Sequence, residues 1–208
     1  MKKLLLCLLA GMLLCFPAGC AQKSAIEGMD ASAALITVDG TVIMTVEDFE
    51  RSLKEQEISG EVKGTQVQKE KDLFLEKAEL RILSHYAELF GLSTDEAFLR
   101  EEYDTHIVEI QDTNIYDKER EFFDKLQEAL GMSDEEYKEW NVSENLMKYN
   151  VTNLMDDLVD TYKYVTDPIY MEELALENLH ALVGMAEVEF GYPGVGKEDL
   201  TFETTLSQ

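Results

Sequence analysis

One long helical stretch constrains the fold of this chain more than any other feature. Between Gln68 and Phe90, apolar residues recur every three or four positions, the spacing of a helix that buries one stripe. The stripe consists of Leu75, Ala78, Ile82, Tyr86, Leu89 and Phe90. A second apolar set widens it, and charged residues such as Lys77 and Arg81 exclude a membrane span. The stretch would be roughly 33 Å long, which predicts a central scaffold helix that packs on more than one side.

Short β-type runs precede the first helix. Leu35 to Val38 and Thr41 to Met44 flank Asp39-Gly40, a strong signal for a hairpin turn. A further strand is expected near the C-terminus, either at Glu187 to Phe190 or in the alternating tail from Thr201 to Gln208. The sequence therefore predicts a mostly α-helical fold with a small β element formed by N-terminal strands, which C-terminal residues complete.

The other helices are defined by caps and glycines. Capping boxes are expected at Thr45 with Asp48, Ser93 with Glu96, and Ser133 with Glu136. Gly91 and Gly131 fit left-handed helix ends, and the stretch from Gly60 to Gly64 predicts a break. Helices are expected at 46–58, 116–130, 134–164 and 168–183, with one more ending near 112.

The N-terminus matches a secretory signal over residues 1–19. Lys2-Lys3 precedes a short apolar run, and Ala18-Gly19-Cys20 resembles the bacterial lipobox, although Pro17 departs from its usual pattern. This resemblance implies cleavage before Cys20 and diacylation of its thiol. The alternative is ordinary secretory cleavage nearby, with Cys20 left as a free thiol. Either form lacks a second cysteine for a disulfide, because the other cysteines lie in the leader.

The predicted organisation has three parts after the leader. Residues 20–34 form the lipidated cysteine and a flexible tether, 35–190 a helical domain, and 191–208 a loop with a C-terminal strand or tail. The formal net charge of −25 excludes a basic footprint for nucleic acid. The acidity favours basic polypeptide partners or, alternatively, serves solubility alone.

Several motifs are similar to those of the SurA/PrsA-type extracytoplasmic chaperones, over roughly residues 34–175. They are Leu35 to Gly40 followed by Val42 to Phe49, Ala87 to Leu92 with its serine-capped restart, and Gly131 to Tyr137 before a long helix. The resemblance implies a SurA N-terminal-like helical domain that holds unfolded polypeptides. The residues after Pro168 do not read as a parvulin domain, so prolyl isomerase activity is not implied.

Candidate sites are few. His85, His106 and His180 lack metal-ligand spacing. Acidic clusters such as Glu101-Glu102 could serve as acid and base, but they also occur on any solvated helix face, so no catalytic residue, metal or cofactor is expected. Aromatic and methionine side chains can adapt to varied partners, and the client-binding candidates are Tyr116, Phe122, Phe123, Trp140 and Met147. We expect a non-catalytic, membrane-anchored holdase that binds unfolded or extended, basic polypeptides and the bilayer through Cys20. The alternative is a structural lipoprotein that docks one dedicated partner in a secretion or cell-envelope assembly.

Overall fold

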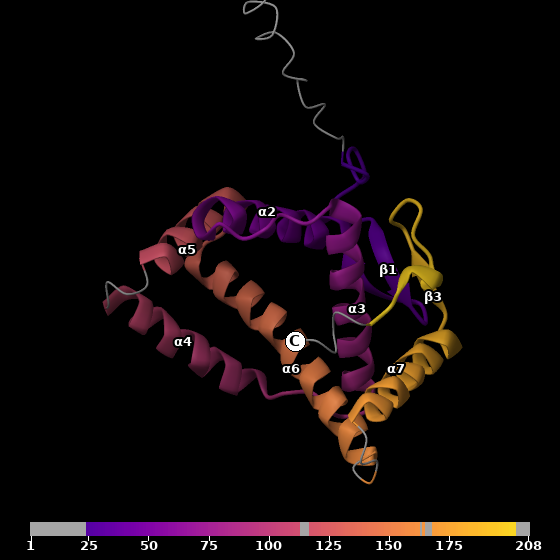
Figure 1. Cartoon of the computed structure of the whole chain (residues 1–208). Coiled ribbons are helices and arrows are strands. Elements are labelled where there is room, and N and C mark those ends of the chain that lie inside the picture. The colour runs from indigo at the N-terminus through magenta and orange to yellow at the C-terminus, as the bar shows by residue number, and fades with distance from the viewer. Residues whose placement is uncertain (1–23, 113–116, 163, 165–167, 203–208) are drawn as a thin grey trace, which may run out of the picture.

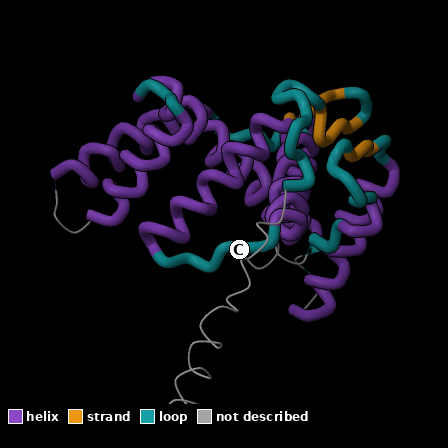
Figure 2. The backbone as a smooth tube through the Cα atoms, turned by 90° about the horizontal axis from the view of Figure 1, so that it is seen from above, coloured by secondary structure: helices purple, strands orange, loops and turns teal. Residues whose placement is uncertain are grey.

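The computed structural model describes residues 24–112, 117–162, 164 and 168–202 (Figure 1). It confirms the predicted fold class, with 68% helix and a small three-stranded antiparallel sheet. The helices are α2 (Val46–Lys63), α3 (Glu70–Leu89), α4 (Glu96–Asp112), α5 (Asp117–Leu130), α6 (Asp134–Thr161) and α7 (Pro168–Met185). The strands are β1 (Ala34–Val38), β2 (Thr41–Thr45) and β3 (Val188–Phe190). Figure 2 shows the strands gathered at one side of the molecule, with helices extending away from them.

The sheet has the strand order β2-β1-β3, and all its pairs are antiparallel. Asp39 and Gly40 have φ angles of 48° and 80°, the left-handed conformation that a tight hairpin turn requires. β3 pairs with β1, with Phe190 opposite Ile36, which confirms the expected contribution of Glu187 to Phe190. The backbone N–H of Glu187 also donates to the Asp39 carboxylate at 2.8 Å. The two ends of the domain therefore meet on one central strand.

The C-terminal residues pack without forming a second strand. Leu200 and Phe202 are 3% and 0% exposed, and the backbone N–H groups of Thr201 and Phe202 donate to the Glu79 carboxylate of α3 at 2.8 and 2.9 Å. The predicted tail strand is therefore not seen at 201–202, and its remainder lies outside the described residues. At the other end, Ile26 is 2% exposed, so residues 24–33 belong to the folded domain rather than to a flexible tether.

Most helix ends lie close to their predicted positions. Gly91 and Gly131 have φ angles of 74° and 63°, as the left-handed stop requires. The capping boxes at Thr45 and Ser133 are present, but the carboxylate of Asp95, rather than Ser93, accepts the N–H of Ala97 at the start of α4.

The predicted end of α2 near Ile58 is wrong. The helix continues through Gly60 to Lys63 and ends at Gly64, which has a φ of 74°. Ile58 and Val62 are both buried in a hydrophobic cluster with α5 and α6. This packing offsets the roughly 1 kcal/mol that a glycine costs inside a helix.

A larger core fills the space between the sheet, α3 and α7. Phe49, Phe74 and Tyr192 form its aromatic centre, with ring centroids 5.3 Å apart for Phe49 and Phe74 and 4.3 Å for Phe74 and Tyr192. One end of α6 contributes Val151 and Leu154. The scaffold helix α3 thus packs against β2, α2 and α6, which confirms that it buries more than one side.

A smaller core lies at the other ends of α2 and α6, where α5 packs against them. Its buried members are Ile58, Val62, Phe122, Leu126 and Tyr137. Partly buried side chains surround them: Tyr103, Phe123, Leu130, Met132 and Trp140. Two long helices, α2 and α6, therefore connect the larger core to the smaller one (Figure 1).

A buried ionic cluster separates these cores. On α3, Lys77 lies 3.3 Å from Glu144 of α6, and Arg81 lies 2.9 Å from the same carboxylate. The side chains of all three are 10–12% exposed. Glu144 follows Tyr137 of the smaller core along α6 and precedes Val151 of the larger core. Polar pairing therefore interrupts the apolar interior at the middle of the molecule.

Candidate functional site

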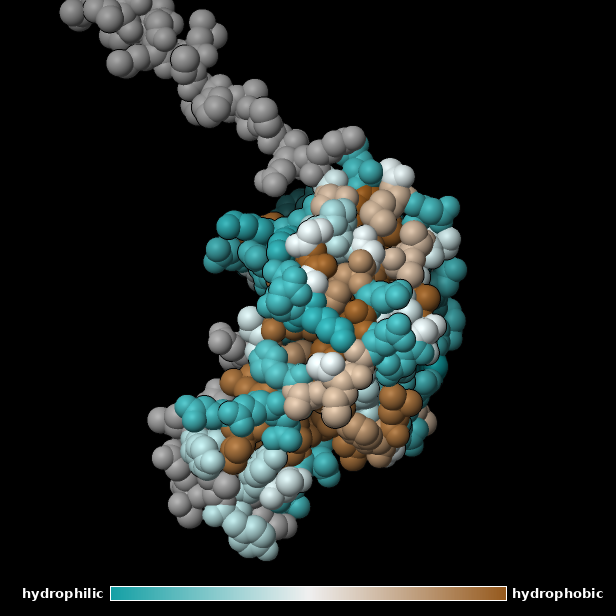
Figure 3. Space-filling model, turned by 90° about the vertical axis from the view of Figure 1, so that its right-hand side faces the viewer, coloured by the Kyte–Doolittle hydropathy of each residue, from teal (hydrophilic) through white to brown (hydrophobic). Residues whose placement is uncertain are grey.

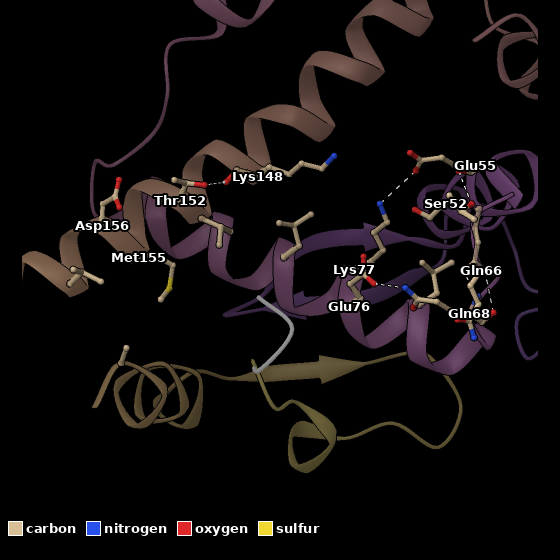
Figure 4. Close-up of a pocket in the computed structure, with 18 of the residues that line it drawn as sticks. Ser52, Glu55, Gln66, Gln68, Glu76, Lys77, Lys148, Thr152, Met155 and Asp156 are labelled. Carbon is tan, nitrogen blue, oxygen red and sulfur yellow. Dashed lines mark hydrogen bonds and ion pairs between the residues drawn. The ribbon is translucent and has the colours of Figure 1, made fainter. Parts of the chain in front are cut away.

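A groove with a volume of about 870 Å³ runs along α3, and we call it the α3 groove (Figure 4). α2 and the loop after it form one end of the groove, and α6 and α7 form the other. The α6–α7 end is mainly apolar. Its apolar lining, together with that of α3, consists of Leu73, Leu80, Val151, Met155, Val159, Met171 and Ala175.

The opposite end of the groove is lined by six neutral polar side chains, together with the carboxylates of Glu55 and Glu76. The neutral side chains are those of Ser52, Gln56, Ser59, Thr65, Gln66 and Gln68. The side-chain oxygen of Gln56 accepts the backbone N–H of Gln68 at 2.6 Å, and the Gln68 side chain donates to Glu76 at 2.8 Å. These bonds hold the loop after α2 against α3, so the polar end is built into the fold.

Lys77 lies between the polar and apolar ends and points toward Glu55 across the groove (Figure 4). Its ammonium is 3.6 Å from the Glu55 carboxylate and 3.3 Å from that of Glu144. Burial opposes the charged form, but the two carboxylates outweigh it and raise the pKa of Lys77 above its ordinary value. Lys77 therefore stays charged and ties the groove floor to the buried ionic cluster.

The size and lining of the α3 groove could accommodate an extended polypeptide segment. The volume falls within the roughly 300–1,000 Å³ of known ligand pockets, and the lining combines apolar surface with amide and hydroxyl groups. Amides and hydroxyls can satisfy the backbone N–H and C=O groups of an extended chain. Apolar side chains of the same segment would lie at the α6–α7 end.

The histidines do not assemble into a site. His85 contacts the ring of Tyr86, His106 that of Phe123 and His180 that of Phe202, with centroids 5.8, 6.4 and 5.2 Å apart. The three histidines lie on α3, α4 and α7, respectively, whereas Phe123 belongs to α5 and Phe202 follows β3. Among the described residues, histidine, cysteine and acidic side chains form no cluster of three or more that could hold a metal ion.

The structure distributes the predicted client-binding residues over several places. Phe122 and Met147 are 7% and 9% exposed and lie in the interior. Trp140 lines a cleft between α2 and the α5–α6 turn, whereas Phe123 lines a groove between α4 and α6. Tyr116 and the expected lipidation site Cys20 lie outside the described residues. None of the four described candidates lines the α3 groove.

The α3 groove was not anticipated from the sequence. Val151 and Met155 are apolar residues of α6, and apolar residues at these positions fit a buried core equally well. The available signal was the uncharged stretch at 65–68, in which Thr65, Gln66 and Gln68 are polar. It lies between two helices and contains few residues that favour a simple turn.

No model of a known protein family matches this chain, and neither a curated protein nor a solved structure matches it. Within the part of the chain that the structure describes, the helices lack the combination of length and apolar character that crossing a membrane requires.

Proposed function

We propose that this protein is a non-catalytic, peptide-binding chaperone that holds extended segments of unfolded polypeptides in the α3 groove. In this proposal Cys20 carries the lipid that anchors the domain at the extracytoplasmic face of a bacterial membrane. The resemblance of the sequence motifs to SurA/PrsA-type chaperones supports the same assignment.

The observation that carries the proposal is the division of the groove lining. Apolar side chains gather at the α6–α7 end, beside Lys148 and Asp156 of α6, and neutral hydrogen-bonding side chains gather at the α2 end, beside Glu55 and Glu76. Such a lining can bind many sequences, because it combines apolar, amide and hydroxyl groups with charges of both signs rather than one charge pattern. Val159, at the apolar end, is 42% exposed and available for contact.

The test measures binding of a short fluorescent peptide of alternating leucine and serine to the purified full chain. Val159→Asp should weaken binding about tenfold, equivalent to about 1.4 kcal/mol, because it puts a carboxylate where an apolar side chain would lie. The same substitution should reduce the protein's ability to suppress light scattering from a thermally unfolding client.

Val108→Asp is the matched control. Val108 is also an exposed helical valine, at 56%, but it lies on α4 and does not line the groove. Binding should therefore remain near the wild-type value. No binding of the neutral peptide, or equal losses in both variants, would contradict the proposal. A single tight partner without client suppression would favour the dedicated-docking alternative.

A further inference from the structure

A second groove, of about 720 Å³, lies between α4 and α6, and we call it the α4 groove. Its α4 wall presents Phe98, Glu101 and Glu102, and its α6 wall includes Tyr149. Phe123 of α5 also contributes to the lining. The lining includes aromatic and acidic side chains but neither lysine nor arginine, in contrast to the α3 groove, which contains Lys77 and Lys148.

The cationic side chains near this groove form ion pairs across the α4–α6 contact, outside the groove. Arg100 of α4 pairs with Glu139 of α6, and Lys138 of α6 pairs with Asp104 of α4 at 2.6 Å. None of these four residues lines the α4 groove. The helix pair thus places its cross-helix ion pairs outside the groove and leaves carboxylates inside it. This segregation makes the groove electrostatically complementary to a cation.

The aromatic side chains of the groove remain accessible. Phe98 is 48% exposed and Tyr149 is 38% exposed, and their rings meet edge to face with centroids 6.2 Å apart. The Tyr149 hydroxyl donates to Glu102 at 3.1 Å, which fixes the ring beside the carboxylates. An aromatic face next to carboxylates is the combination that attracts a lysine or arginine side chain, through charge and cation–π attraction.

We propose that the α4 groove is a separate docking site for lysine- or arginine-bearing segments of a polypeptide. The side-chain cation lies against Phe98 and near Glu101, while Tyr149 and Phe123 contact its aliphatic part. Among the described residues, the Glu101 carboxylate takes part in no hydrogen bond or ion pair, so it is available to such a cation. This inference stands apart from the proposed function, since it concerns another groove and another client chemistry.

The test uses three short fluorescent peptides with the purified full chain: alternating lysine and alanine, glutamate and alanine, and leucine and serine. The lysine peptide should bind, and the glutamate peptide should not. Glu101→Lys should weaken binding of the lysine peptide about tenfold, because the substitution replaces a charge attraction with a repulsion. Raising the salt concentration from about 0.05 M to about 0.5 M should also weaken binding of the lysine peptide. The Debye length then falls well below about 10 Å, so the charge attraction is screened.

Matched variants separate a defined site from general charge. Glu128→Lys makes the same charge change at an exposed position of α5 outside the groove, and it should reduce affinity less than about twofold, as expected for distant screened charges. Phe98→Leu keeps an apolar side chain but removes the aromatic face, and it should lower the affinity for the lysine peptide about threefold. Neither change should alter binding of the leucine peptide.

Equal weakening by Glu101→Lys and Glu128→Lys would overturn the inference, because the lysine peptide would then respond to net charge alone. If Val159→Asp abolished binding of the lysine peptide, the inference would also be overturned, because the lysine and leucine peptides would then share the α3 groove. If the leucine peptide fails to bind while the lysine peptide behaves as described, the proposed function fails and this inference stands.

Discussion

The larger and smaller cores are built on the same two helices, yet they differ in how completely they are closed. In the larger core, Phe49 and Phe74 are fully buried, and the sheet, α3 and α7 cover them. In the smaller core, Leu126 is fully buried, but Phe122 and Tyr137 retain 7% and 3% exposure beside half-buried neighbours. The strands and both chain ends that the structure describes join the larger core.

This difference indicates that the two regions of the domain differ in local stability. Regions with few enclosed apolar contacts open at lower free energy than a closed core does. The ionic cluster around Glu144 limits how far such an opening extends, because it ties α3 to α6 between the two cores. The larger core therefore acts as the stable scaffold, and the half with α4 and α5 is the more readily deformed part.

Replacing an aromatic ring in each core gives the largest expected contrast. Phe74→Ala should lower the free energy of unfolding by about 3–5 kcal/mol, because the cavity it leaves is fully enclosed. Phe123→Ala should cost about 1–2 kcal/mol, since that ring is half-buried and the site can collapse. Urea unfolding measures both values, and equal losses would show that the two cores are equally closed.

Hydrogen exchange on the same two variants sharpens the contrast. Phe123→Ala should accelerate exchange in α4 and α5 while leaving β1 and α3 protected. Uniform acceleration across all elements would mean that the domain opens only as one unit.

A smaller effect is expected from the ionic cluster between the cores. Glu144→Gln should destabilise the protein by about 2 kcal/mol, because it removes a buried carboxylate that accepts from both Lys77 and Arg81. Glu139→Gln is the control at an exposed ion pair, and it should cost less than about 1 kcal/mol. A cost for Glu144→Gln no larger than the control would show that the cluster does not hold the cores together.

The smallest expected effect is a change in how the stability of the protein depends on pH. Burial and the nearby Glu70 carboxylate raise the pKa of Tyr192 in the larger core to about 12, from an ordinary value of 10.0. The folded state thus retains a proton that the unfolded chain loses. The stability from this group is complete below pH 10.0 and is lost as the pH rises toward about 12.

Tyr192→Phe should therefore flatten the decline of the melting temperature between pH 10.0 and about 12. Burial also raises the pKa of Tyr137 in the smaller core, so Tyr137→Phe should flatten the same decline from pH 10.0 upward. An unaltered curve for Tyr192→Phe would show that the hydroxyl keeps its ordinary acidity in the fold.

Local signals predicted most of the scaffold. The hairpin at Asp39-Gly40, the stops at Gly91 and Gly131 and the length of α3 depend on nearby residues, so the sequence alone carries them. The end of α2 was mispredicted for the opposite reason. Gly60 is a local breaker, and only the packing of Val62 against α5 carries the helix past it.

The grooves depend on which helix faces remain uncovered, and periodicity cannot show that. Leu154 and Met155 are neighbours on α6, but Leu154 is buried in the larger core, whereas Met155 is only partly buried and also lines the α3 groove. Phe122 and Phe123 are neighbours on α5, yet Phe122 is buried in the smaller core, whereas Phe123 packs at its edge and lines the α4 groove. The role of each ring could be assigned only once the positions of α4 and α6 were known.

The central position of β1 imposes an order on biosynthesis. β1 and β2 are joined by a short hairpin and can pair locally, but the other edge of β1 stays open until β3 at Val188–Phe190 is available to pair with it. An open strand edge can pair with another chain. Nearly the whole domain must therefore be synthesised before that edge is covered, and a chain interrupted before Val188 would expose it permanently.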